Sequence, residues 1–314
     1  MRARDAAVAL FALVVGASAR SEAQSDSIKV VLLGTGVGPG VNLEQFGASI
    51  LVEAGGERFL FDCGRGATTR LTQIGVPTGS VTKVFLTHLH SDHIIQLPDI
   101  LLTGWAGGRR VSALEVWGPA GTTTMMDHLV KAFAFDIHLR RDVDEKLSAS
   151  GIRVISHEAK EGPVFDERGV KITAFLVDHG PVVPAFGYRI DYGGRSVVLS
   201  GDTRVSENLI RFAHGVDVLI HEGIDADAIR NRLDHPNPSA IEAIIAHHTT
   251  AQQAGEVFSR VKPRLAVYSH APNSAALIAQ TRTTYAGPLQ GAEDLLTIVI
   301  GEKIAVRHFA PPLR

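Results

Sequence analysis

The sequence predicts a layered α/β fold in which two β-sheets pack face to face and helices cover the outer face of each sheet. Three observations support this prediction. After residue 28, short apolar strands alternate with amphipathic helices, no low-complexity linker interrupts the chain, and the strand pattern restarts near residue 170. Each half of the chain would supply one sheet with its helices. The strand ends of both halves would then meet at one edge.

The first half contains four predicted strands and three predicted helices. Gly55 and Gly56 predict a hairpin turn, and a helix that starts at Ala67 should end before Gly75 and Pro77, which are common stop signals. The strands are expected at residues 28–33, 49–52, 59–61 and 81–86, and the helices at residues 67–74, 94–102 and 121–135.

The second half repeats this alternation. Gly193 and Gly194 predict another hairpin turn. The strands are expected at residues 170–177, 187–192, 196–199, 216–220, 265–268 and 295–300, and the helices at residues 207–212, 251–261 and 273–285.

The composition sets broad limits on function. The 314 residues are 45% hydrophobic and 20% charged, which is typical of a globular domain with a large core. A formal net charge of −2 gives no overall attraction to nucleic acid, so binding a polyanion would need a local basic patch. Cys63 is the only cysteine, which excludes an intrachain disulfide.

The first 23 residues resemble a secretory signal peptide. Arg2 and Arg4 precede an apolar stretch at residues 6–15, which is too short to span a bilayer as a helix. Cleavage after Ala19 or Ala23 would release a periplasmic or secreted protein. Its folded domain would occupy residues 28–310. The alternative is a leader that is retained as an N-terminal tether.

One short run concentrates metal-binding side chains at a strand-to-helix turn. His88, His90, Asp92 and His93 lie within six residues, between a predicted strand and a predicted helix. His88 and His90 are two apart on an extended segment and can bind one ion, whereas Asp92 and His93 point to a second. Imidazole nitrogen together with carboxylate oxygen suits zinc. Packing alone gives an ordinary surface no reason for such a density of ligands.

Several motifs in order resemble one known superfamily. The run at residues 88–93 matches the HxHxDH signature of the metallo-β-lactamase superfamily. The segments at residues 62–66 and 184–190 resemble the branch that contains ribonuclease Z and secreted arylsulfatase-like and phosphodiesterase-like hydrolases. This resemblance implies an αββα fold with two packed mixed sheets. The later motifs are Asp178-His179-Gly180, Ser200-Gly201-Asp202-Thr203, His221-Glu222-Gly223, His248 and His270.

The resemblance also implies a binuclear zinc centre, with manganese(II) or iron(II) as alternative occupants. Alone, His179 or His270 would be interpreted as a hydrogen-bonded core histidine, but their places after predicted strands favour metal binding. Cys63 is not at a ligand position and is expected to pack near the site. The implied ligands are His88, His90 and His179 on the first ion, Asp92, His93 and His270 on the second, and Asp202 bridging both.

A hydroxide that bridges the two ions would be the nucleophile, oriented by Asp92. His248 is the expected acid for the leaving group, with Glu222 polarising it, because this pair resembles the glutamate and histidine of ribonuclease Z. A carboxylate partner raises the pKa of an imidazole and fixes its tautomer. His247 is interpreted as part of a solvated helix face and His221 as a structural hydrogen-bonding residue, so neither is given a catalytic role.

Features that the chain lacks indicate a small substrate. No long basic arm separates His179 from Asp202, and residues 37–42 lack the basic, asparagine-bearing loop of ribonuclease Z. Without these clamps, a large RNA would lose its main phosphate contacts. RNA is therefore not the expected partner, and a small-molecule ester fits better.

The pocket walls are predicted near two loops. Trp105 would stack on an aromatic ring, Arg109 or Arg110 would hold an anionic group, and Phe186 would line the opposite side. An ordinary surface turn with a solvated arginine pair is the alternative. Gln96 replaces the glycine that usually follows HxHxDH, and it would either face the substrate or replace a glycine within the helix.

The sequence therefore predicts an exported dizinc hydrolase of sulfate or phosphate esters, with arylsulfatase-like or phosphodiesterase-like activity. The first alternative is a tRNA 3′-processing endoribonuclease. The second is an amide or lactone hydrolase with weak β-lactamase activity. No stable membrane span is expected, and a homodimer is compatible with the sequence. A metal-binding protein without catalysis would require a degraded ligand set, which the motifs do not show.

Overall fold

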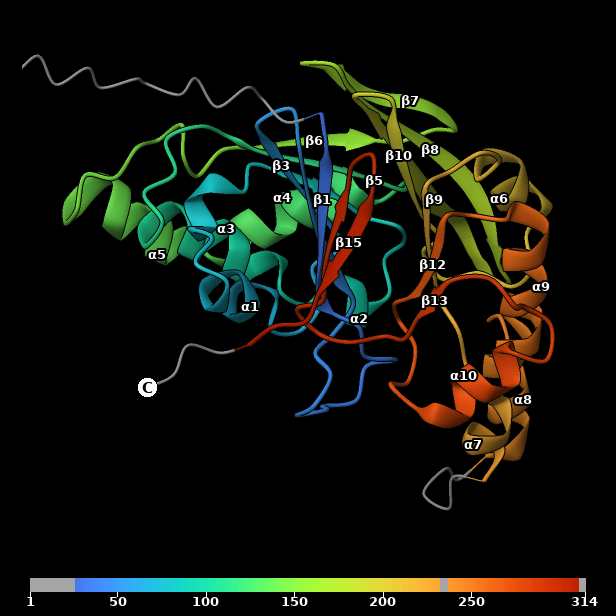
Figure 1. Cartoon of the computed structure of the whole chain (residues 1–314). Helices are drawn as coiled ribbons and strands as arrows, with labels where there is room; N and C mark the ends of the chain where they lie inside the picture. Colours follow the sequence, from blue (N-terminus) through green and yellow to red (C-terminus); the bar gives the residue numbers. More distant parts are fainter. Residues whose placement is uncertain (1–25, 232–236, 311–314) are drawn as a thin grey trace, which may run out of the picture.

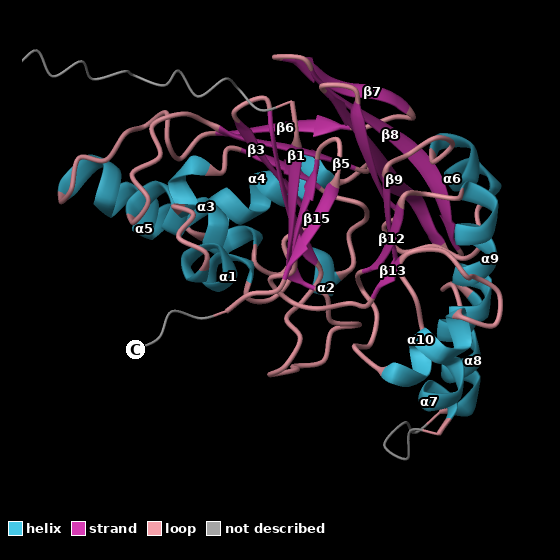
Figure 2. Ribbon diagram, in the orientation of Figure 1, coloured by secondary structure: helices cyan, strands magenta, loops and turns pink. Residues whose placement is uncertain are grey.

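Two β-sheets lie face to face at the centre of the fold, and helices cover their outer faces (Figures 1 and 2). The computed structural model describes residues 26–231 and 237–310, so the predicted leader lies outside the described residues. The first sheet runs in the order β15 (Ile304–Arg307), β14 (Thr297–Ile300), β1 (Ile28–Gly34), β2 (Ser49–Ala54), β3 (Glu57–Phe61), β4 (Lys83–Phe85), β5 (Leu114–Gly118) and β6 (Val154–Glu158).

The second sheet is built mostly from the later part of the chain. Its order is β13 (Leu289–Gln290), β12 (Leu265–Tyr268), β11 (Val218–His221), β10 (Arg195–Leu199), β9 (Val182–Tyr192), β8 (Val170–His179) and β7 (Gly162–Glu167). Strands β10, β11 and β12 are parallel, as are β3, β4 and β5 in the first sheet. Parallel strands end at the same edge of a sheet, which is where ligands bind in α/β folds.

The helices separate into two outer layers (Figure 2). The layer on the first sheet contains α1 (Ala67–Gln73), α3 (Leu97–Ala106), α4 (Thr122–Ala132) and α5 (Ala134–His138), with short 3₁₀ and π segments at Thr78–Ser80 and Leu139–Val143. The short helix α2 (Ser91–Ile94) lies at the edge of the sheets. The layer on the second sheet contains α6 (Glu207–Phe212), α7 (Ala226–Arg230), α8 (Pro238–Ala246), α9 (Ala251–Val261) and α10 (Ala275–Thr281).

Three hydrophobic clusters hold these layers together. The central cluster lies between the sheets, where the rings of Phe61 and Phe85 stack with centroids 5.1 Å apart and Tyr188 packs beside them. The other two clusters lie between each sheet and its helices, around residues such as Leu101 in the first layer and Phe258 in the second. Burying each such side chain stabilises the fold by about 1.5–3 kcal/mol.

The predicted αββα architecture is confirmed, but the assignment of one half of the chain to each sheet is wrong. The predicted strand at residues 295–300 appears as β14 and pairs antiparallel with β1, so that Ile28 faces Ile300 in the first sheet. Strands β5, β6, β7, β13 and β15 and helices α7 and α8 were not predicted. The predicted helix at 94–102 is two helices, α2 and α3, which meet at Gln96. No helix in the described ranges has the length and apolar character needed to cross a membrane.

Candidate metal centre

The first sheet presents one compact group of polar side chains just beyond β4. His88 and His90 lie on an extended segment after Phe85, and α2 then carries Asp92 and His93. The ring centroid of His88 lies 4.7 Å from that of His90 and 4.1 Å from that of His93. The sharp change from extended chain to helix therefore turns neighbouring residues of the sequence toward one point.

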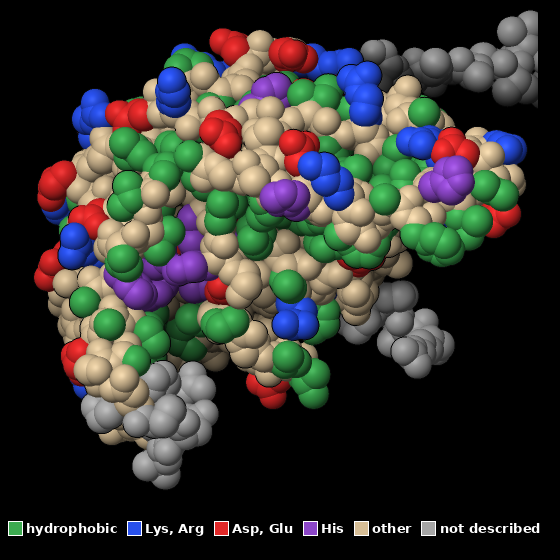
Figure 3. All heavy atoms as spheres, turned by 180° about the vertical axis from the view of Figure 1, so that it is seen from behind, with side chains coloured by type: hydrophobic (Ala, Val, Ile, Leu, Met, Phe, Trp, Pro, Cys, Tyr) green, Lys and Arg blue, Asp and Glu red, His purple; other side chains and the backbone are tan. Residues whose placement is uncertain are grey.

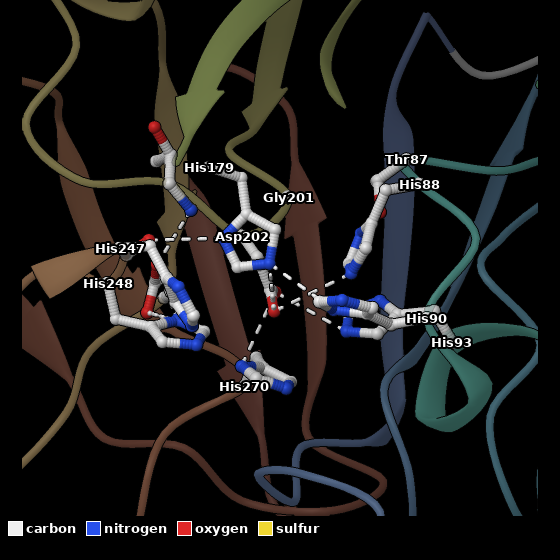
Figure 4. A network of polar contacts seen from close by, with 12 residues as sticks. Thr87, His88, His90, His93, His179, Gly201, Asp202, His247, His248 and His270 are labelled. Carbon is white, nitrogen blue, oxygen red and sulfur yellow. Dashed lines mark hydrogen bonds and ion pairs between the residues drawn. The ribbon is translucent and has the colours of Figure 1, made fainter. Parts of the chain in front are cut away.

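The second sheet presents its side chains from three separate strand ends. His179 is the last residue of β8, Asp202 follows the end of β10, and His270 follows the end of β12. The parallel pairing of β10 and β12 with β11 brings the last two to one edge. Figure 4 shows these side chains facing His88, His90 and His93 across the gap between the sheets.

All seven residues predicted as ligands lie in one cluster, which we call the ligand cluster. His179 Nε2 lies 3.3 Å from His90 Nδ1, and Asp92 Oδ2 lies 3.3 Å from His270 Nε2. Asp202 lies between these two groups. Its Oδ2 is 3.9 Å from Nε2 of both His88 and His179, and its Oδ1 is 3.4 Å from His93 Nε2 and from His270 Nδ1.

Unpaired polar atoms in the ligand cluster fit bound cations. His88 Nε2, His93 Nε2, His270 Nδ1 and Asp202 Oδ1 are buried without a hydrogen-bond partner. Leaving such a group unpaired costs about 1–3 kcal/mol, so four of them together need a compensating partner. The groups His88, His90, His179 and Asp92, His93, His270 each bring three ligand atoms within 4.8 Å of one another. The donor set is imidazole and carboxylate, as divalent transition metals require.

The protonation states also suit cation binding. Burial lowers the pKa of His88 well below its usual value, and burial lowers the pKa of His179 to about 4 although Asp202 opposes this shift. Burial opposes ionisation of Asp202, but the charges of His270 and His93 outweigh burial and lower its pKa. Burial opposes protonation of His93, but the charges of Asp202 and Asp62 outweigh burial and raise its pKa well above the usual value, so a cation would displace a proton from His93 on binding. His88 and His179 already offer neutral imidazoles, and Asp202 offers an ionised carboxylate. These are the forms that coordinate metals.

Asp62 orients the first-sheet side of the ligand cluster, a role that was not predicted from the sequence. Its Oδ2 lies 2.8 Å from His93 Nδ1, and its Oδ1 accepts a hydrogen bond of 2.8 Å from the Thr87 amide. A carboxylate on the far nitrogen fixes the tautomer of a metal-binding histidine. The available signal was the position of Asp62 directly after a predicted strand, beside the parallel strand that leads to His88.

Glu222 and His248 form a buried ion pair next to the ligand cluster. His248 Nδ1 lies 3.0 Å from Glu222 Oε2, and the His248 ring centroid is 5.0 Å from that of His179. Burial opposes protonation of His248, but the charge and hydrogen bond of Glu222 outweigh burial and raise the pKa of His248 to about 9. Burial also raises the pKa of the Glu222 carboxyl, against the effect of His248. We assign the proton to His248, because the adjacent Glu222 carboxylate stabilises the protonated imidazole.

His247 lies closer to the site than the sequence suggested. Its ring centroid is 4.9 Å from those of His179 and His248, and Figure 4 shows it on the same side of the cluster as His248. The backbone oxygen of His247 lies 3.1 Å from His179 Nδ1, which leaves His179 Nε2 facing the cluster. His221 is fully buried, with Nδ1 2.7 Å from the Glu222 oxygen, in agreement with a structural role.

None of the predicted pocket residues presents its side chain to a substrate at the ligand cluster. Trp105 is 1% exposed and donates its indole N–H to the Ser148 oxygen, so no face is free for a substrate ring. The Phe186 backbone lies beside the cluster, where its amide donates a 2.9 Å hydrogen bond to the Thr87 oxygen, but its side chain is buried between the sheets. Arg110 is buried and donates to three backbone oxygens. Arg109 follows α3, whose 10 residues lead about 15 Å away from α2.

Gln96 and Cys63 have structural positions beside the cluster. Gln96 Oε1 accepts a 2.7 Å hydrogen bond from the Gly66 amide and its Nε2 donates to Asp99, which ties the start of α3 to the loop after β3. Cys63 is fully buried, and its backbone amide donates to the His93 oxygen. Neither side chain faces the ligand cluster as a metal ligand.

Comparison with known proteins then identifies the family. The model of the Beta-lactamase superfamily domain matches residues 57–271. The chain is 38% identical to the ribonuclease Z of Mycobacterium marinum (strain ATCC BAA-535 / M) over 245 residues, which cover 77% of this chain and 86% of the relative. The chain belongs to the metallo-β-lactamase-fold hydrolases, in their ribonuclease Z-like branch.

Two further comparisons extend the match over nearly the whole metallo-β-lactamase-fold domain. The ribonuclease Z of Mycobacterium sp. (strain KMS) is 32% identical over 287 residues, which cover 89% of this chain and 99% of the relative. The crystal structure of the metallo-β-lactamase fold protein YhfI from Bacillus subtilis has a TM-score of 0.66 at 20% identity, covering 87% of this chain and 100% of that protein. This structural likeness shows the shared fold.

Proposed function

We propose that this protein is a dimetal hydrolase of phosphoric and sulfuric esters, with phosphodiesters as its main substrates. The Glu222–His248 pair carries the proposal, because it places a protonated imidazole beside a cluster that fits two cations. Two zinc ions would be held by the seven residues of the ligand cluster, with Asp202 shared between them. Divalent cations at such a site lower the pKa of water and neutralise charge on the attacked group.

The side chains divide the work of hydrolysis. A water oxygen forms the new bond to phosphorus or sulfur, and the bond to the leaving oxygen breaks. His248 donates a proton to that leaving oxygen, which avoids expulsion of an unstable alkoxide. Glu222 keeps the proton on His248 until transfer and fixes the ring through Nδ1. Asp92 is positioned to accept a proton or hydrogen bond from the attacking water.

The surroundings of the ligand cluster favour a small, partly apolar ester. Five loops around the ligand cluster, at residues 35–48, 87–96, 178–186, 246–250 and 268–274, contain no lysine or arginine, and the loops at residues 62–66 and 201–206 carry one arginine each, Arg65 and Arg204. Val41 and Leu43 are 70% and 87% exposed on the first of these loops, which reaches the site where the Gly38 amide lies 3.5 Å from His270 Nε2. Figure 3 shows hydrophobic side chains beside the group of histidines at the surface. Phosphate clamps for a long RNA are not present on these loops.

The second candidate is tRNA 3′ processing, which the relatives named ribonuclease Z support. The alignment spans 287 residues and covers 89% of this chain and 99% of the mycobacterial relative. The two aligned stretches are therefore nearly equal in length, and the relative has no room for an additional arm of tens of residues. The missing arm therefore does not separate this chain from those relatives. The names of the relatives favour RNA, and the composition of the loops favours a small ester.

A substrate series separates the candidates. Zinc-loaded protein would be given a precursor tRNA with a 3′ trailer, bis(p-nitrophenyl) phosphate, p-nitrophenyl sulfate, a lactone and a cephalosporin. If the protein hydrolyses small esters, it should turn over the aryl phosphate and sulfate esters and should not cleave the precursor tRNA at a specific position. Cleavage of the precursor at the trailer junction would establish the second candidate. Preference for the lactone or cephalosporin would overturn the proposal.

We also propose export, based on the predicted leader at residues 1–23. Export would separate the protein from precursor tRNA and favour a small ester. Protein from the native host should begin after Ala19 or Ala23 and fractionate with the periplasm or medium. An intact Met1 in a cytoplasmic fraction would contradict export and strengthen the RNA candidate.

A further inference from the structure

A cleft of about 230 Å³ opens directly beside the ligand cluster on the first-sheet side. Asp92 and Ser91 line it on one side and the loop after β1 lines it on the other. Ile95 adds an apolar wall, and Arg65 adds a positive charge. The remaining lining residues are Gly38, Pro39, Gly40 and Gly47. We call this space the Arg65 cleft.

Close backbone packing fixes Arg65 at this cleft. The Arg65 oxygen accepts a 3.0 Å hydrogen bond from the Gly47 amide, and the next amide, of Gly66, donates to Gln96 Oε1. Glycine is required at the neighbouring positions. A Cβ on Gly64 would lie 2.4 Å from the backbone oxygen of Asp92, and a Cβ on Gly47 would lie 2.5 Å from the backbone nitrogen of Arg65. Arg65 is therefore held at a defined position next to α2.

The charge of Arg65 is not used within the described part of the chain. Its side chain is exposed, and no carboxylate of the described residues lies within ion-pair distance of its guanidinium. Arg70, five residues later, makes such a pair with Asp294, and Arg204 makes one with Asp178. Among the described residues, the loops around the ligand cluster supply no other lysine or arginine apart from Arg204, which is paired with Asp178. Arg65 is thus a free cation at the entrance to the site.

We propose that the Arg65 cleft binds a second anionic group, carboxylate or phosphate, on the part of the substrate that does not leave. This inference rests on the proposed ester hydrolysis. Guanidinium binds carboxylate and phosphate through paired hydrogen bonds, and the small volume of the cleft restricts this anion to a short distance from the scissile group. The substrate class is therefore a phosphodiester whose retained half carries its own negative charge.

The two halves of the site support this orientation. His248, which protonates the leaving oxygen, follows α8 on the second-sheet side, whereas the Arg65 cleft is formed by loops and α2 on the first-sheet side. Figure 4 shows His248 and the histidines of residues 88–93 on opposite sides of Asp202. A substrate that spans the ligand cluster would place its leaving group near His248 and its retained group near Arg65.

Matched substrates test the proposal. The first pair is 2-carboxyethyl p-nitrophenyl phosphate and its carboxamide analogue. The second pair is thymidine 5′-(p-nitrophenyl phosphate) with and without a 3′-phosphate, which represents a neighbouring nucleotide phosphate. Arg65→Ala should raise KM about tenfold or more for the charged member that fits the cleft, because it removes a hydrogen bond between charged groups. For the members that lack the second negative group, KM should change less than about twofold. For all four substrates, kcat should change less than about twofold. Arg65→Lys should retain part of the effect.

The controls separate failure of this inference from failure of the proposed function. Arg109→Ala removes an exposed arginine far from the cluster and should change neither pair. Binding of non-hydrolysable methylenephosphonate analogues, measured by calorimetry, gives a second readout that does not require turnover. Activity with no preference for a charged member, or an equal kcat loss on all four substrates in Arg65→Ala, would overturn the role of Arg65. A wild-type protein that hydrolyses none of these esters would instead overturn the proposed function.

Discussion

The two sides of the ligand cluster are built in different ways. The first-sheet side takes four potential ligands from residues 88–93, a single turn between β4 and α2. The second-sheet side takes His179, Asp202 and His270 from three strand ends spread over about ninety residues of sequence, and the Glu222–His248 pair from two further places. Local chain geometry sets the first side, whereas the register of a whole sheet sets the second.

This difference has a consequence for stability of the site. On the first side, Asp62 and the Thr87 amide hold a preformed turn through direct hydrogen bonds. On the second side, each ligand depends on neighbouring strands remaining paired, as β10 and β12 do with β11. The two carboxylate oxygens of Asp202 face different groups of ligands, Oδ2 toward His88 and His179 and Oδ1 toward His93 and His270, so removing Asp202 should affect both groups at once.

The largest effect is expected for Asp202→Ala. Because the Asp202 oxygens face different groups of ligands, zinc occupancy should fall at both positions, and activity should fall about a thousandfold or more. Metal analysis and kinetics of the purified protein would measure both. Asp178→Asn is the matched control, since Asp178 is next to His179 but pairs with Arg204. Full zinc loading of Asp202→Ala would show that Asp202 is not shared between the two groups of ligands.

The contrast also explains what could be predicted from sequence. The turn at residues 88–93 was predictable because ligand spacing and local secondary structure coincide. His179, Asp202 and His270 were selected through motif order and their places after apolar runs, and the structure brings them to the same cluster. The prediction of the pocket residues was wrong because the burial of a side chain depends on tertiary packing. Trp105 was expected in a loop, but it lies near the end of α3 with its ring in the core.

Two features of the structure could not be predicted from the sequence pattern alone. Arg65 stands in a motif that resembles the family, yet its proximity to Asp92 depends on the close approach of Gly47 and Gly64. The strand at 295–300 has an ordinary apolar pattern, and nothing in it specifies pairing with β1 in the first sheet. Both depend on contacts between segments far apart in the chain.

His248→Ala tests the second-sheet side without removing a ligand. Zinc content should stay normal, while kcat for esters with poor leaving groups should fall about a hundredfold or more. Esters with nitrophenolate as the leaving group need little protonation and should lose much less. A series of aryl and alkyl phosphodiesters would measure this dependence. Equal losses over the series, or loss of zinc, would assign His248 a structural or ligand role.

Asp62→Asn tests the first-sheet side. The amide can still accept from Thr87 but cannot accept from His93 Nδ1–H, so metal affinity should fall about 10- to 100-fold. The larger loss should fall on the ion bound by His93, because Asp62 reaches His88 only indirectly, through the Thr87 hydroxyl. A titration against a chelator would reveal one site as more strongly weakened than the other. Glu53→Gln is the control. Glu53 lies near the end of β2 that is remote from Asp62 and pairs with Arg58, so its substitution should leave both metal sites intact. Equal weakening of both ions would show that Asp62 supports the whole turn at residues 88–93 and not mainly His93.

Glu222→Gln should change the pH dependence more than the rate at neutral pH. Glu222 raises the pKa of His248 to about 9, so the acid is protonated below that pH and activity on poor leaving groups should fall as pH rises through it. Removing the carboxylate lowers the pKa of His248, and the decline should begin at lower pH. The kcat profile between neutral pH and pH about 10 measures this shift. An unchanged alkaline limb would mean that His248 does not control it.

The smallest effect is expected at His247, although it is the sequence neighbour of His248. Its backbone oxygen, which a substitution leaves in place, is the group that contacts His179 Nδ1. Its ring is only partly buried and makes no side-chain hydrogen bond among the described residues, so His247→Ala should keep full zinc loading and change kcat less than about fivefold. His247→Ala and His248→Ala would be measured on the same ester with a poor leaving group. We expect their losses of kcat to differ by more than tenfold, although the two residues are adjacent. Comparable losses would mean that both histidines handle the leaving-group proton, and the acid on the second-sheet side would then be a pair of residues instead of His248 alone.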